Sequence, residues 1–101
     1  MQHKCKITVI QKDCNKKLGK YVKQPEKIAE CNLVELGQEF IVENMFFPPE
    51  GMCESAWADI RSSIMAIATG GEFDIMSNTS SIVSTCSDPF RPVLFLIERC
   101  D

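Results

Sequence analysis

The feature that most constrains the fold of this chain is a helix-forming segment that runs from Ser55 to Thr69 and ends in Gly70-Gly71. Apolar residues recur in it at three- and four-residue spacing, which places them on one helical face: Trp57, Ile60, Ile64, Ile67 and Ala68. Ser55 is expected to cap the first turn, and the glycine pair supplies a left-handed stop. The segment therefore predicts a helix of about four turns, ~22 Å long, with one face to bury.

Most of the remaining chain has the alternation or the composition of β-strands. Residues 5–11 alternate loosely between apolar and polar side chains, which predicts a half-buried strand. Residues 36–43 predict a second strand, entered through a turn at Gly37. The side chains expected to point inward are Ile7, Val9, Phe40 and Val42. Residues 93–97 are apolar on both faces, which predicts a central strand. We also expect two short strands within residues 72–86, separated by a polar loop at 77–81.

Prolines and glycines mark the connecting segments. Residues 46–53 contain two prolines and a glycine, which predicts a loop that its two neighbouring phenylalanines would anchor to the core. Residues 18–23 fit either a short return strand or a helical turn. Pro25 can open a short helix at 26–30, and residues 87–91 are expected to form a turn.

These segments predict an α+β fold of four to six strands and one long helix. We expect a mostly antiparallel sheet, roll or barrel-like, with the helix packed on it. A chain of 101 residues has the length of one domain and can bury a core without disulfides, so residues 1–101 are assigned to a single domain. No apolar run approaches the roughly 18 residues that a membrane span needs, so no membrane partner is expected.

Charge is unevenly distributed along the chain. Residues 1–27 hold eight lysines and two acidic residues, a net charge of +6, whereas residues 28–101 hold three arginines and twelve acidic residues, a net charge of −9. A basic segment can bind phosphates, or it can be a solvated hairpin whose lysines discourage pairing between sheet edges. Because Tyr21 is the one aromatic residue in the basic segment and the whole chain is acidic, nucleic acid is not the expected partner.

The six cysteines fit either a disulfide scaffold or a set of reduced thiols. The N-terminal sequence has neither the apolar stretch nor the small-residue cleavage site of a secretory signal. We therefore expect reduced thiols and a cytoplasmic location.

Two motifs resemble those of a known protein family: Gly-x-Cys-x-x-Ala-Trp-Ala-Asp-Ile at residues 51–60 and Cys-x-Asp-x-x-Arg-Pro-Val at residues 86–93. The family consists of small prokaryotic proteins of about this length, conserved and uncharacterised, many of them from anaerobes. The resemblance covers essentially the whole chain, through Cys31, Gly37, Phe40, Gly51, Cys53, Trp57, Ala58, Asp59, Gly70, Gly71, Cys86, Asp88, Arg91 and Pro92. At Thr85 the family pattern often has a second, adjacent cysteine, which speaks against a four-thiolate site. The resemblance implies no activity, but it singles out Cys31, Cys53 and Cys86.

These three cysteines are candidate ligands of zinc or another thiophilic metal, such as copper(I) or an iron–sulfur cluster. A fourth ligand could come from His3, Asp59 or Asp88. The spacing is not that of a structural zinc site, because no two cysteines are closer than nine positions. Cysteine also packs as a small buried hydrophobe, so inert packing is the alternative.

Cys53 is in addition a candidate reactive thiol. It lies just before the predicted helix, where the helix dipole favours a thiolate, although Glu50 and Glu54 oppose this effect. A nucleophilic cysteine usually needs a base, and His3 is the one histidine, near the N-terminus. A cysteine–histidine hydrolase is therefore not expected.

Further residues in the two motifs are candidates for ligand binding: Trp57, Asp59, Asp88 and Arg91. Arg91 could centre a pocket for a small anionic ligand beside Cys53 and the helix N-terminus. The structural alternatives are an ion pair of Arg91 with Asp59, or with Asp88 to hold the turn before the last strand, and a core position for Trp57.

Two hypotheses of function follow. Glycine-rich phosphate loops, His-Glu-x-x-His, EF-hand and serine-nucleophile motifs are absent, which excludes those classes of protein. An enzyme that acts on a small anionic substrate through Arg91 and Asp59 stays open, although no motif supports it. The first hypothesis is a small cytoplasmic protein that binds a metal or carries out thiol redox chemistry through the three motif cysteines. The second is a non-catalytic binding or homo-oligomeric assembly module in which the cysteines only pack.

Overall fold

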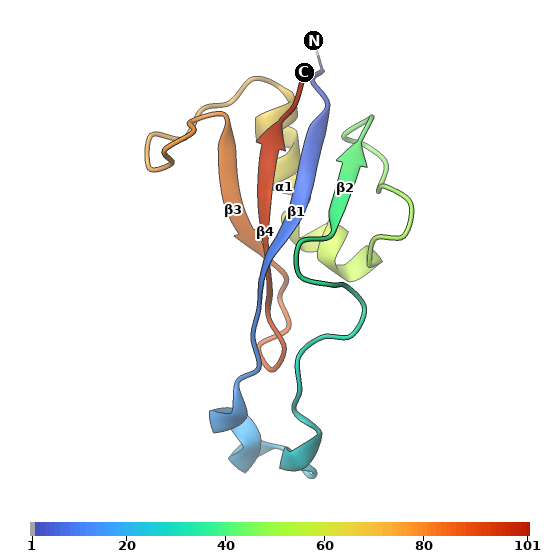
Figure 1. The fold of residues 1–101 in the computed structure, drawn as a ribbon, viewed down its shortest axis with the longest axis vertical. Helices are drawn as coiled ribbons and strands as arrows, with labels where there is room; N and C mark the ends of the chain where they lie inside the picture. Colours follow the sequence, from blue (N-terminus) through green and yellow to red (C-terminus); the bar gives the residue numbers. More distant parts are fainter. Residues whose placement is uncertain (1) are drawn as a thin grey trace.

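The computed structural model describes residues 2–101 and shows a four-stranded antiparallel sheet with a long helix against one face (Figure 1). The elements are, in chain order, β1 (Cys5–Lys12), the 3-10 helices η1 (Lys16–Tyr21) and η2 (Pro25–Lys27), β2 (Glu39–Val42), α1 (Glu54–Ala68), β3 (Ser81–Thr85) and β4 (Val93–Arg99). The predicted α+β class is confirmed. Among these helices, none combines the length and the apolar character that crossing a bilayer requires.

The strands lie in the order β2-β1-β4-β3, and each neighbouring pair is antiparallel. β4 is central, as its apolar sequence predicts, because Ile97 lies opposite Ile7 of β1 and Ile82 of β3. β2 and β3 form the two edges, so the sheet is open and the expected roll or barrel-like closure is not confirmed.

The core lies between α1 and the sheet face turned toward it. Ile60, Ile64 and Ile67 of α1 have exposed fractions of 0%, as the helical spacing predicts. The sheet contributes alternate side chains of every strand, among them Ile7, Val9, Phe40, Val42, Phe95 and Ile97. The side chains expected to point inward from β1 and β2 are therefore the buried ones.

The opposite face of the sheet is not covered by any element in residues 2–101. Leu94 and Leu96 of β4 are half-buried there, and Val83, the register partner of Leu96, is exposed. The apolar character of β4 on both faces thus reflects its central position rather than burial on both sides.

The start of α1 differs from the prediction. The helix begins at Glu54 with Cys53 at the N-cap position, so Ser55 lies inside the first turn and does not cap it. The Cys53 carbonyl accepts the N–H of Trp57 at 3.0 Å, which is the first bond of the helical ladder. At the other end, Gly70 has the left-handed φ of +95° that the glycine pair predicts.

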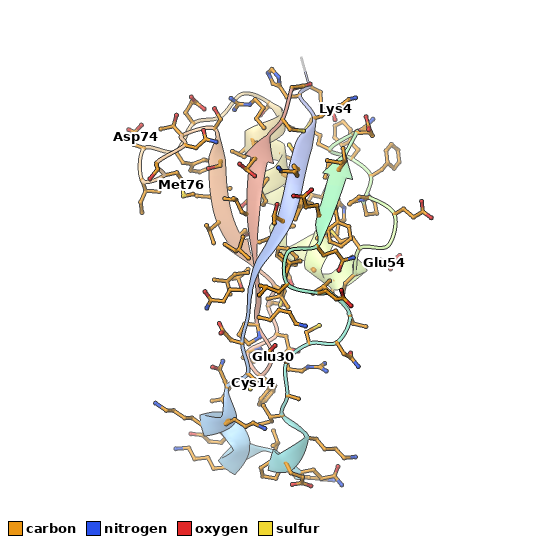
Figure 2. The ribbon with its side chains drawn as sticks, in the orientation of Figure 1. Lys4, Cys14, Glu30, Glu54, Asp74 and Met76 are labelled. Carbon is orange, nitrogen blue, oxygen red and sulfur yellow. The ribbon has the colours of Figure 1, made fainter. Side chains whose placement is uncertain are left out.

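Residues 13–35 extend beyond the sheet as an arm that contains η1 and η2 (Figure 1). Cys14 and Glu30 lie near its base (Figure 2). Residues 18–23 adopt the helical alternative in part, and the helix expected at 26–30 is a single 3-10 turn, Pro25–Lys27. The expected hairpin of lysines therefore does not form.

Two further predictions are wrong, one about the loop at residues 46–53 and one about a strand within residues 72–80. Phe46 and Phe47 are 52% and 67% exposed, so they do not anchor their loop to the core. Residues 72–80 contain no strand, because this segment folds on itself through turns such as the bond from the Phe73 N–H to the Thr79 carbonyl at 2.9 Å. Of the two short strands expected within 72–86, β3 alone forms.

Candidate functional site

A cavity of about 330 Å³ lies where α1 begins, next to the loop that connects β3 and β4. Its lining contains six of the eight residues that the sequence singles out: Cys31, Cys53, Asp59, Cys86, Asp88 and Arg91. We call it the three-cysteine cavity. Three chain segments supply these side chains, namely the return of the arm, the first turns of α1 and the β3–β4 loop.

Each cysteine of the cavity sits at an end of an element or in a connecting segment. Cys31 lies on the extended return of the arm, Cys53 is the N-cap of α1, and Cys86 follows β3. All three are half-buried and none forms a disulfide. This combination of partial burial and a shared cavity leaves the thiols accessible to a small ligand.

Cys86 is the cavity cysteine with the most defined backbone partners. Its N–H donates to the Val93 carbonyl at 3.0 Å, and its Sγ accepts the N–H of Val93 at 3.3 Å. These bonds close the β3–β4 loop and fix the Cys86 side chain at the cavity wall.

Cys53 occupies a position where other residues would stabilise the helix better. Serine, threonine, aspartate and asparagine are the preferred N-caps, whereas Cys53 makes no side-chain hydrogen bond to the first turn. Its thiol is therefore not occupied by the helix and lies at the positive end of a 15-residue helix dipole.

Asp88 organises the turn before β4. Its Oδ1 accepts the N–H groups of Phe90 and Arg91 at 2.9 and 3.2 Å, and its Oδ2 accepts the Nε–H of Arg91 at 3.2 Å. Burial raises the pKa of Asp88, but these hydrogen bonds and the Arg91 charge outweigh it, so the pKa lies below its ordinary value. Of the alternatives for Arg91, the pair with Asp88 is confirmed.

Asp59 links α1 to the same turn, because its Oδ2 accepts the N–H of Ser87 at 2.7 Å. The wall between the polar groups is apolar. It includes Val34, Val93 and Phe95, which are 6%, 3% and 1% exposed. Neither these wall residues nor Ser87 can be recognised as lining residues from the sequence, since their role depends on the tertiary arrangement.

Trp57 and His3 lie away from the cavity. Trp57 is 7% exposed and belongs to the core, and it does not line the cavity. The N–H of His3 donates to the Ala68 carbonyl, at the end of α1 opposite Cys53. Since a 15-residue helix is ~22 Å long, His3 is neither a base nor a fourth ligand at this site.

The other three cysteines have different environments. Cys5 is 0% exposed in the sheet, and burial raises the pKa of its thiol to about 11. Cys14 lies near the base of the arm, and Cys100 is exposed near the C-terminus. These residues provide internal controls for any test of the cavity thiols.

Within residues 2–101, no group of three or more histidine, cysteine, aspartate or glutamate side chains is placed so that it could hold a metal ion. The three cysteines thus share a cavity without forming a preorganised metal centre.

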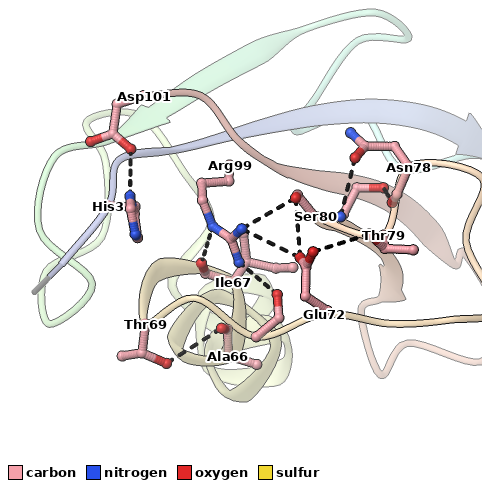
Figure 3. Close-up of polar contacts among 12 residues, drawn as sticks. His3, Ala66, Ile67, Thr69, Glu72, Asn78, Thr79, Ser80, Arg99 and Asp101 are labelled. Carbon is pink, nitrogen blue, oxygen red and sulfur yellow. Dashed lines mark hydrogen bonds and ion pairs between the residues drawn. The ribbon is translucent and has the colours of Figure 1, made fainter.

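The opposite end of α1 is held by a polar network that the sequence did not reveal (Figure 3). The Arg99 guanidinium donates to the carbonyls of Ile67 and Gly71 at 3.0 and 2.6 Å and to Ser80 Oγ at 3.2 Å. Glu72 accepts from Ser80 and Thr79, both at 3.1 Å. Arg99 therefore satisfies carbonyls at the helix C-terminus, where a cation is favourable.

Comparison of the chain with models of protein families, with curated proteins and with solved structures finds no match. The family resemblance of the two motifs therefore stays a prediction. The chemistry of the cavity itself is what indicates a function.

Proposed function

We propose that this protein is a thiol–disulfide redox protein that works through Cys31, Cys53 and Cys86. The observation that carries the proposal is that these three thiols, separated by 22 and 33 positions in the sequence, line one cavity of about 330 Å³. Independent packing of buried cysteines would have no reason to bring three half-buried thiols to the same cavity.

Redox chemistry fits the arrangement better than metal binding. A metal centre needs ligands in a fixed geometry, and the described residues offer no such group. Thiol–disulfide exchange needs only that one thiol attacks and that a second thiol can reach the mixed disulfide. Because the three half-buried thiols line one cavity, we expect a second thiol to reach the mixed disulfide on the first.

Cys53 is the attacking thiol in this proposal, because it lies at the α1 N-terminus and its side chain makes no bond to the helix. Its thiolate attacks one sulfur of a substrate disulfide, and the substrate S–S bond breaks. The first product leaves as a thiol with the proton that Cys53 gave up. A second cavity cysteine then attacks the Cys53 sulfur, which releases the second thiol and leaves an intramolecular disulfide.

The proposal is tested in a background of Cys14→Ser and Cys100→Ser, which removes the cysteines that lie outside the cavity and outside the core. The reduced protein is mixed with excess hydroxyethyl disulfide, and the released thiol is counted. Closure of one intramolecular disulfide releases two thiols per chain and lowers the protein mass by two hydrogens. A third released thiol and one adduct appear only where the remaining cavity cysteine also exchanges. Cys53→Ser should abolish the rapid phase.

The remaining cysteine variants identify the second thiol. The variant of Cys31 or Cys86 that accumulates the mixed disulfide on Cys53 removes the resolving residue. Adducts on all cavity thiols without an intramolecular disulfide would contradict the redox proposal and favour the assembly hypothesis. Cys5→Ser is the matched control, since the core thiol should not change the thiol count.

A further inference from the structure

Beyond its thiols, the three-cysteine cavity contains two charged side chains that still have hydrogen-bonding atoms without a partner in residues 2–101. Arg91 uses Nε for Asp88, and its two Nη groups make no hydrogen bond within residues 2–101. Asp59 uses Oδ2 for the Ser87 N–H, and its Oδ1 has no partner in the same part of the chain. The lining therefore offers one guanidinium edge and one carboxylate oxygen to a ligand.

The charge balance of the cavity argues for a ligand that carries both signs. Asp88 and Arg91 form an ion pair, so their charges offset each other, and Asp59 is then left without a cation in the lining. A purely anionic ligand would meet Arg91 but would also meet Asp59. A zwitterion satisfies both, with a carboxylate on Arg91 and an ammonium on Asp59.

The rest of the lining suits a small ligand with a soft, apolar centre. Val34, Val93 and Phe95 form an apolar wall beside the three thiols. A volume of about 330 Å³ lies at the lower end of the ~300–1,000 Å³ range of ligand pockets. Sulfur close to an α-amino and an α-carboxylate group is the chemistry of an amino-acid thiol.

We infer that the substrates of the cavity are disulfides of α-amino-acid thiols, such as cystine, held by Arg91 and Asp59 while a cavity thiol attacks the sulfur. This inference rests on the proposed thiol–disulfide function and adds its substrate class. The exchange is balanced without a further reactant. The substrate disulfide gains two electrons and becomes two thiols, and two cavity thiols lose them and become one disulfide, their protons passing to the products.

The test compares four disulfides that differ in charge, in the Cys14→Ser, Cys100→Ser background. Cystine carries both groups, cystamine carries ammonium alone, dithiodipropionate carries carboxylate alone, and hydroxyethyl disulfide carries neither. Each rate is divided by the rate of the same disulfide with free mercaptoethanol, which removes differences in intrinsic reactivity. We expect the normalised rate for cystine to exceed the other three by about tenfold or more.

Charge-neutral variants assign the two contacts. Arg91→Gln should lower the rates of exchange with cystine and with dithiodipropionate by about tenfold and leave the rate with cystamine unchanged. Asp59→Asn can still accept the Ser87 N–H. It should lower the rates of exchange with cystine and with cystamine and leave the rate with dithiodipropionate unchanged. Each variant should change the rate with hydroxyethyl disulfide less than it changes the rate with cystine. Lys23→Gln and Glu26→Gln make the same charge changes on the exposed arm and are the matched controls.

The outcomes separate this inference from the function on which it rests. Equal normalised rates for all four disulfides would overturn the substrate class and leave the redox function intact. The same holds if Arg91→Gln and Asp59→Asn slow exchange with hydroxyethyl disulfide as much as exchange with cystine. If none of the four disulfides oxidises the cavity thiols, the proposed function itself is wrong.

Discussion

The two ends of α1 are built in opposite ways. At the C-terminal end, Arg99 donates to two backbone carbonyls and to Ser80, and Glu72 accepts from two hydroxyl groups (Figure 3). At the N-terminal end, the cap is a cysteine without a capping bond, and the first turn borders a cavity.

This difference indicates where the fold is stabilised and where it is kept available for a ligand. Polar groups at the C-terminal end satisfy one another, so little is left there for a partner to bind. Groups that can still bind a ligand are concentrated at the N-terminal end. They are the three cavity thiols, the Arg91 Nη groups and Asp59 Oδ1. Sites that depart from the most stabilising choice are expected where function acts.

The largest expected effect is a difference in thiol reactivity. Cys5 is 0% exposed and its pKa is raised to about 11 by burial, so its thiolate is both scarce and shielded. We expect alkylation of the native protein at pH 7.5 to modify Cys53 faster than Cys5 by about 100-fold or more. Peptide mapping after timed iodoacetamide pulses measures the ratio, and comparable rates would break the distinction between cavity and core thiols.

The second prediction compares one arginine at each end of the helix. Arg99→Ala leaves the carbonyls of Ile67 and Gly71 without their donor, and we expect the free energy of unfolding to fall by about 2–3 kcal/mol. Arg91→Ala removes a half-exposed ion pair, for which less than about 1 kcal/mol is expected. Urea denaturation measures both. Equal losses would show that the N-terminal end is as tightly stabilised as the C-terminal end.

The third prediction concerns acid. The hydrogen bond from Ser80 is the largest cause that lowers the pKa of Glu72 from 4.5, and the pKa of Asp88 is lowered from 3.8. A lowered carboxylate pKa contributes stability that is present above the ordinary value and lost as the pH falls through the folded-state pKa.

Glu72→Gln should therefore flatten the acid loss of stability below about pH 4.5, and Asp88→Asn should flatten it below about pH 3.8. Each amide keeps one acceptor oxygen, so it retains the bonds of one carboxylate oxygen and loses those of the other. Lost contacts lower the stability at every pH, whereas lost titration changes its slope with pH. Thermal unfolding between pH 2.5 and 6 measures the effect. If a variant loses stability with falling pH as steeply as the parent protein, the replaced carboxylate has the same pKa in the folded and unfolded states.

The smallest effect is expected at the cap itself. Cys53→Ser supplies the hydroxyl that an N-cap position favours, so the free energy of unfolding should rise by about 0.5–1 kcal/mol. The same substitution should abolish the rapid redox phase. Chemical denaturation measures the first part. A loss of stability instead would mean that the thiol contributes packing that serine cannot replace.

Periodicity predicted the parts of the fold that depend on which side chains face the core. The spacing of Ile60, Ile64 and Ile67 gives the buried face of α1, and the apolar run of β4 gives its central position. The exposure of Phe46 and Phe47 was not predictable, because composition does not tell whether a loop folds back on the core.

The candidate site was predictable only in part. Asp88 and Arg91 are three positions apart, so a local pair could be expected from the sequence. The meeting of Cys31, Cys53 and Cys86 rested on the motif resemblance, since no local rule brings together residues that are 22 and 33 positions apart. The Arg99 network could not be predicted for the same reason, because its acceptor carbonyls, on Gly71 and Ile67, lie 28 and 32 positions away in the sequence.

The most direct measurement is a map of the disulfide that forms when the reduced, otherwise unaltered protein meets one equivalent of hydroxyethyl disulfide. Tryptic peptides are identified by mass spectrometry after rapid trapping of the remaining thiols. A single intramolecular bond between two of Cys31, Cys53 and Cys86 is the expected result. Oxidation spread over Cys14 and Cys100, or links between chains, would contradict the claim that the cavity joins its three thiols into one reactive unit.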